Sequence, residues 1–71
     1  MKEIEKRLTT FSLVLKYIIE NNDLDYANWL YNKVLKFKQS DLFKGCAEPE
    51  QIAELERIKK ELEGLGATVE I

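Results

Sequence analysis

The chain has 71 residues, of which 45% are hydrophobic and 34% charged, and its formal net charge is −2. This composition is typical of a folded globular domain, and the length allows one domain, residues 1–71, with one core. Without histidine and with Cys46 as its one cysteine, the sequence holds no zinc ligand set and no partner for an intrachain disulfide. Domains this small often gain stability by association, so we expect contact with another chain.

The N-terminal region shows neither an export signal nor a membrane span. Acids alternate with bases before residue 8, and the apolar run 11–19 is interrupted by Ser12, Lys16 and Tyr17. A membrane-spanning helix needs about 20 apolar residues. We therefore expect a cytoplasmic protein without a membrane partner, and the richness in Asn, Lys and Ile suggests a bacterial or phage origin.

Residues 2–20 are predicted to form an amphipathic helix, because apolar residues recur at intervals of three and four. The stripe consists of Ile4, Leu8, Phe11, Leu15, Ile18 and Ile19. Residues 9–19 also contain many residue types that favour sheets, so a strand is the alternative for that segment. The unbroken stripe favours the helix.

Residues 23–39 are predicted to form a second helix. Asn21, Asn22 and Asp23 are short polar residues that end one helix and cap the next. The connection is so short that the two helices should pack as an antiparallel hairpin.

This second helix has apolar residues on two opposite faces. One stripe suits the core and consists of Leu24, Ala27, Leu30, Tyr31, Val34 and Leu35. The opposite face is our candidate protein-binding site, because tyrosine and tryptophan are enriched at binding hot spots. It consists of Tyr26, Trp29, Lys33 and Phe37. The alternative is that this face packs against the third helix or the 41–46 loop.

A third helix is predicted over residues 49–63, after a short turn capped by Ser40 in which Leu42 and Phe43 plug the end of the bundle. Pro49 suits the first turn of that helix. Its apolar stripe consists of Ile52, Leu55, Ile58, Leu62 and Leu65. Gly64 and Gly66 are candidate residues for its C-terminal end.

Residues 67–71 alternate with a period of two and are predicted to form a strand. Such a strand would need a partner in the 42–46 loop, in another copy or in a foreign sheet. The expected fold is thus mainly α, a three-helix domain built from a helical hairpin plus a third helix, with a short C-terminal β-strand.

Nothing in the sequence favours an enzyme, a cofactor or a metal site. Histidine is absent, serine occurs only at positions 12 and 40, and no glycine-rich phosphate loop is present. The acids at 48, 50, 54 and 56 suit the positive end of a helix dipole, and none follows the EF-hand spacing. Cys46 lacks a histidine base, so we expect an inert, partly buried thiol.

Our hypothesis is a protein–protein interaction module that acts as an inhibitor, adaptor or regulatory protein by occlusion or bridging. Residues 48–71 carry a net charge of −4, so Glu54, Glu56 and Glu61 are expected to steer a protein partner with a basic or apolar groove. The first alternative is a homodimer formed through the aromatic face or the C-terminal strand. The least favoured alternative is nucleic-acid binding through a set of lysines, namely Lys33, Lys36, Lys38 and Lys44.

Overall fold

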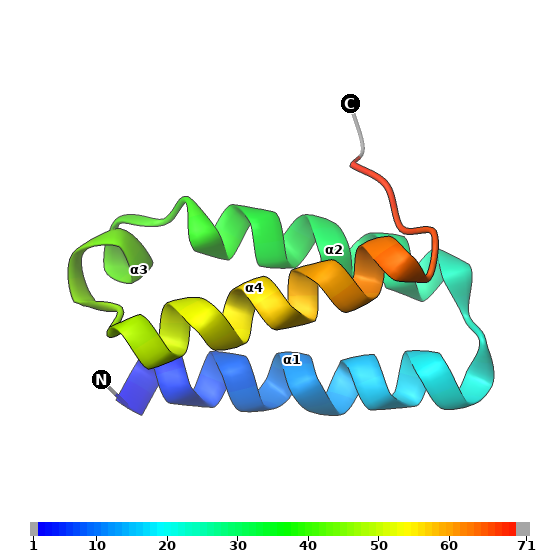
Figure 1. The fold of residues 1–71 in the computed structure, drawn as a ribbon, viewed down its shortest axis with the longest axis horizontal. Helices are drawn as coiled ribbons and strands as arrows, with labels where there is room; N and C mark the ends of the chain where they lie inside the picture. Colours follow the sequence, from blue (N-terminus) through cyan, green and yellow to red (C-terminus); the bar gives the residue numbers. More distant parts are fainter. Residues whose placement is uncertain (1, 70–71) are drawn as a thin grey trace.

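The protein is mainly helical in the computed structural model, which describes residues 2–69 (Figure 1). Its elements in chain order are α1 (Lys2–Asn21), α2 (Leu24–Lys38), α3 (Asp41–Cys46) and α4 (Pro49–Gly64). α1, α2 and α4 lie where three helices were predicted, and α1 replaces the strand alternative for residues 9–19. α3 is a fourth, short helix where we expected only a turn.

The helices form a bundle of two layers. α1 and α2 are antiparallel neighbours, and α4 lies against both and runs in the same direction as α1 (Figure 1). The shortest extent of the Cα positions is 15 Å. Two helices packed roughly 8–10 Å apart, each with a Cα radius of about 2.3 Å, account for this thickness. The hairpin therefore has α4 on one face and no helix of the described residues on the other.

A two-residue turn joins α1 to α2. Asn22 adopts a φ of 55°, a left-handed conformation that asparagine tolerates better than most residues. The backbone N–H of Asp23 donates back to the carbonyl of Ile18 at 3.3 Å. Its side chain meanwhile accepts the N–H of Tyr26 at 3.1 Å and caps α2. Asp23 thus ends α1 with its backbone N–H and caps α2 with its side chain.

The core lies between α1, α2 and α4 and contains most of the predicted stripes. Its buried members are Ile4, Leu8, Phe11, Leu15, Ile18, Ala27, Leu30, Tyr31, Val34, Phe43, Leu55, Ile58, Leu62 and Ala67. Ile19, Leu24, Ile52 and Leu65 were expected in these stripes, but all four are exposed, Ile19 and Leu24 by about half. Ile19 is rotated by about 100° from buried Ile18, and Leu24 begins α2 at the end of the bundle.

Local capping explains α3 and the start of α4. The Ser40 hydroxyl accepts the N–H of Phe43 at 3.2 Å, and the Phe43 ring is buried over the end of the bundle, as predicted. Pro49 occupies the first turn of α4. The side-chain oxygen of Gln51 accepts the N–H of Glu48 at 2.9 Å. Gln51 is buried, so this hydrogen bond gives its side-chain oxygen a donor.

The predicted C-terminal strand is wrong for residues 67–69, which have no regular secondary structure; residues 70–71 lie outside the described part of the chain. Gly66 adopts a φ of 98° and ends α4 in a Schellman motif. In that motif the N–H of Ala67 donates to the carbonyl of Leu62 and the N–H of Gly66 to that of Glu63, both at 3.1 Å. The chain turns back here and buries Ala67 against the bundle. None of the described helices is both long and apolar enough to cross a membrane.

Candidate functional site

Trp29 is the most exposed aromatic residue of the face predicted on α2. Its side chain is 49% exposed. Tyr26, one turn earlier, lies with its ring centroid 5.2 Å from that of Trp29 and is partly buried. Tyr17 of α1 packs edge-on against Tyr26 at 5.8 Å. Tyr26 therefore packs against Trp29 and is itself held by Tyr17, while about half of the Trp29 side chain stays exposed.

Phe37 belongs to a second aromatic cluster. Its ring centroid lies 5.7 Å from that of Phe11 in α1 and 5.3 Å from that of Phe43 in α3. Phe37 is thus partly buried at the edge of the core. The alternative, that this face packs against the 41–46 segment, therefore describes Phe37 and does not describe the half-exposed Trp29.

Lys33 completes the predicted face. Its Nζ atom lies 5.6 Å from the centroid of the Trp29 ring, within the range of a cation–π contact. The side chain remains exposed. The ammonium group and the indole together form a surface with one apolar and one positive part.

Trp29 and Lys33 stand at the edge of a groove between α1 and α2, with a volume of about 730 Å³. The two helices supply all of its lining. The floor is apolar and includes buried or partly buried side chains, namely Phe11, Val14, Leu30 and Phe37. The rim is exposed and consists of Glu3, Lys6, Arg7, Thr10, Trp29, Lys33 and Lys36. We call this feature the hairpin groove.

The rim of the hairpin groove is basic. Glu3 is the only acid among the described residues that line it, and its Oε1 lies 3.6 Å from Nε of Arg7 in an exposed ion pair. Lys6, Lys33 and Lys36 form no ion pair with another described residue. The groove therefore has a net positive charge on a protein whose overall charge is −2. Asp25 lies outside the groove, in a smaller hollow on the far side of Trp29.

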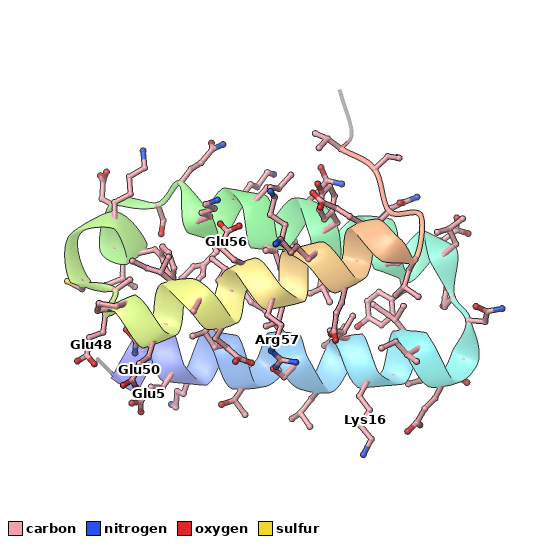
Figure 2. The ribbon with its side chains drawn as sticks, in the orientation of Figure 1. Glu5, Lys16, Glu48, Glu50, Glu56 and Arg57 are labelled. Carbon is pink, nitrogen blue, oxygen red and sulfur yellow. The ribbon has the colours of Figure 1, made fainter. Side chains whose placement is uncertain are left out.

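The predicted acids of α4 do not join the aromatic face. Glu56 points toward α2, where it forms an ion pair with Lys38, and Arg57 lies between α4 and α1 (Figure 2). Glu54 forms an ion pair with Arg57, whose other partner is Glu61 at 3.8 Å. Each of the three acids therefore has a basic partner within the chain, and Glu54 and Glu61 share Arg57.

The ion pairs hold two carboxyl groups below their ordinary pKa. The guanidinium of Arg57 lowers the pKa of Glu54 through a hydrogen bond, and the ammonium of Lys38 lowers that of Glu56 in the same way. Both groups stay charged at neutral pH. The pair of Glu56 with Lys38 joins α4 to α2, and the pair of Glu54 with Arg57 lies within α4, so neither acid is unpaired on the surface.

A second cluster of acids lies at one end of the bundle. Glu5, Glu48 and Glu50 gather where α1 and α4 both begin (Figure 2). The positive ends of two helix dipoles meet there and stabilise negative charge. No three acidic, cysteine or histidine side chains of the described residues are arranged so that they could hold a metal ion. The cluster therefore has a structural explanation.

The lysines considered for nucleic-acid binding do not form one surface. Lys33 and Lys36 line the hairpin groove, Lys38 pairs with Glu56, and Lys44 lies on α3. Cys46 is exposed at the end of α3, where we expected a partly buried thiol. It is not among the residues that line the hairpin groove.

Sequence reasoning missed the contribution of α1 to the site. Lys6, Arg7 and Val14 lie opposite or beside the α1 stripe, where they read as ordinary helix-surface residues. Their role depends on how α1 packs beside α2. Periodicity alone does not give that relation.

Comparison of the chain with protein-family models, with curated proteins and with solved structures finds no match.

Proposed function

We propose that this protein is a protein–protein interaction module that acts by occlusion or bridging, as an inhibitor, adaptor or regulatory protein, and that performs no catalysis. The observation that carries the proposal is the half-exposed Trp29 beside an apolar groove. A tryptophan held by neighbouring rings loses little conformational entropy when a partner covers it. It is thus a suitable anchor for a binding hot spot.

The contact centres on Trp29 and Lys33, with Tyr26 and Phe37 as their supports. The contribution of α4 that we expected from the sequence is smaller, because its acids already pair with bases of the same chain. Mechanistically, such a module works by covering a surface of its partner or by holding two partners together.

Site-specific photo-crosslinking tests this proposal. A benzophenone amino acid replaces Trp29 in the native cells, and the matched control carries it at Leu13, which is 64% exposed and lies outside the hairpin groove. We expect a discrete protein adduct from position 29 that is missing from position 13. Equal adducts from both positions, or none from either, would contradict the proposal.

A homodimer through the same face is the second candidate, supported by the same exposed Trp29. Light scattering at physiological salt over a wide concentration range separates the two. The module we propose has the mass of one chain, 8.3 kDa, at every concentration. A stable mass of two chains would assign the face to self-association.

A further inference from the structure

The hairpin groove has the shape of a site for one more helix. α4 fills the groove on one face of the α1–α2 hairpin, and the hairpin groove is its counterpart on the other face. At a rise of about 1.5 Å per residue, the lining runs for roughly 16 Å along α1 and roughly 12 Å along α2. That length matches a helix of about three turns.

The chemistry of the groove specifies the character of that helix. An apolar floor with Val14 and Phe37 calls for apolar side chains that repeat at each turn, at spacings of three and four. The exposed lysines on the rim, Lys6, Lys33 and Lys36, call for acids on both sides of that apolar stripe. Lys6 stands on α1 and the other two on α2, so the positive charge flanks the groove from both helices.

We propose that the hairpin groove binds an acidic amphipathic helix of a partner protein, which thereby becomes the fourth helix of the bundle. This inference rests on the proposed function and names the partner's chemistry. It also reverses the charge expected from the sequence, because the groove beside Trp29 is basic and the acids of α4 are paired elsewhere.

A second copy of the chain does not supply such a helix. α4 is acidic and amphipathic, but its stripe of Leu55, Ile58 and Leu62 is buried in its own bundle. α1 also buries its apolar stripe, except for Ile19, which is about half exposed. None of the described helices therefore presents a free apolar stripe flanked by acids.

A nucleic acid fits the groove less well than an acidic helix. The bases on the rim would also attract phosphates, but Lys38 and Lys44 do not line the groove, and Arg7 pairs with Glu3. An apolar floor adds nothing to phosphate contacts. It does match the side chains of an amphipathic helix.

The test is a selection from a display library of helical peptides of about 14 residues, long enough for the groove. Leucines stand at spacings of three and four, and each flanking position varies among Glu, Gln and Lys. We expect the selected peptides to be enriched in Glu. Enrichment in Lys, or no enrichment at all, would overturn the inference.

The selected peptides then report where they bind. Trp29 is the only tryptophan, so its emission should shift to shorter wavelength as the peptide fills the groove. Lys33→Glu with Lys36→Glu should weaken binding by about tenfold or more. The matched control, Lys16→Glu with Lys44→Glu, makes the same charge change outside the groove and should leave affinity within about twofold. Equal losses in both pairs, or binding without a Trp29 signal, would place the peptide elsewhere.

The remaining outcomes separate this inference from the proposed function. A DNA or RNA oligonucleotide that binds more tightly than the peptides, with the same dependence on Lys33 and Lys36, would identify the groove as a nucleic-acid site and overturn the inference. A dimer in light scattering would identify it as an interface with a second copy and would also overturn the inference. If no acidic peptide binds while position 29 still crosslinks to a partner protein, the inference fails and the proposed function stands. Failure of both experiments removes both.

Discussion

The side-chain oxygen Oδ1 of Asn28 accepts the backbone N–H of Thr68 at 3.0 Å. One turn further along α2, the amide of Asn32 donates to the carbonyl of the same Thr68 at 3.4 Å. Two asparagines thus bond the backbone groups that a strand partner would otherwise satisfy. The segment after α4 consequently lies along α2 without forming a sheet.

Asn28→Ala should release this segment without unfolding the bundle. Alanine favours the helix, so the overall stability is a poor measure of the change. Hydrogen exchange of the Thr68 amide should instead become much faster, while amides in the middle of α1 and α4 keep their rates. Asn21→Ala is the control, because that side chain bonds only the carbonyl of Tyr17 within α1. Unchanged protection of Thr68 in Asn28→Ala would show that this hydrogen bond does not hold the segment.

α1, α2 and α4 could be predicted from the sequence because each depends on local signals. The spacing of Ile4, Leu8 and Phe11 shows the buried face of α1, and Asp23 is a capping residue by type and position. Both features act within a few residues of the chain. Tertiary packing then has little to change except at exposed stripe ends such as Ile19.

The C-terminal strand was predicted wrongly and the hairpin groove was not predicted. In both cases the structure depends on residues that are distant in sequence. The period-two pattern after Gly66 suits a strand, but Asn28 and Asn32 bond the backbone of Thr68 first. The basic groove likewise arises only when Lys6 and Lys36 meet across two helices. Neither relation has a signature within one segment.

Asp23→Ala should lower the free energy of unfolding by about 1 kcal/mol, the usual cost of losing an N-cap side chain. The N–H of Tyr26 loses its acceptor, so the first turn of α2 becomes less stable. Urea denaturation followed by circular dichroism measures the loss. Asp23→Asn keeps an acceptor oxygen and should cost much less. Equal losses for the two variants would indicate that the charge, and not the cap, stabilises this turn.

The protein should become less stable as the pH falls below about 4.5. Ion pairs or hydrogen bonds lower the folded-state pKa of Glu54, Glu56 and Glu63 below the ordinary 4.5. A lowered pKa gives stability that is present above the ordinary value and is lost as the pH falls through the folded value. Urea unfolding between about pH 7 and pH 3 should show this loss. Glu56→Gln should lose less unfolding free energy than the parent as the pH falls. Glu20→Gln is the control, because Glu20 forms no ion pair with another described residue.

The loss of stability at high pH should depend on Tyr31. Its hydroxyl donates to Oε2 of Glu63 at 2.7 Å, and this hydrogen bond raises the pKa of Tyr31 above the ordinary 10.0. A raised pKa gives stability that is present below the ordinary value and is lost as the pH rises through the folded value. The free energy of unfolding of Tyr31→Phe should therefore fall less steeply with rising pH, above about pH 10, than that of the parent. An identical loss of stability at high pH in the two proteins would contradict the assignment.

Trp29→Ala and Leu30→Ala should differ sharply, although the residues are neighbours in α2. Leu30 is fully buried, so its truncation should lower the free energy of unfolding by about 2–5 kcal/mol. Trp29 is half exposed, and its truncation should cost roughly 1 kcal/mol because a partner, and not the fold, is to cover it. Urea denaturation at two protein concentrations measures both. In a homodimer that buries Trp29, its truncation would instead destabilise the protein as much as the loss of Leu30, and the parent's unfolding midpoint would rise with concentration. The expected small, concentration-independent loss leaves the surface of Trp29 available to a different protein.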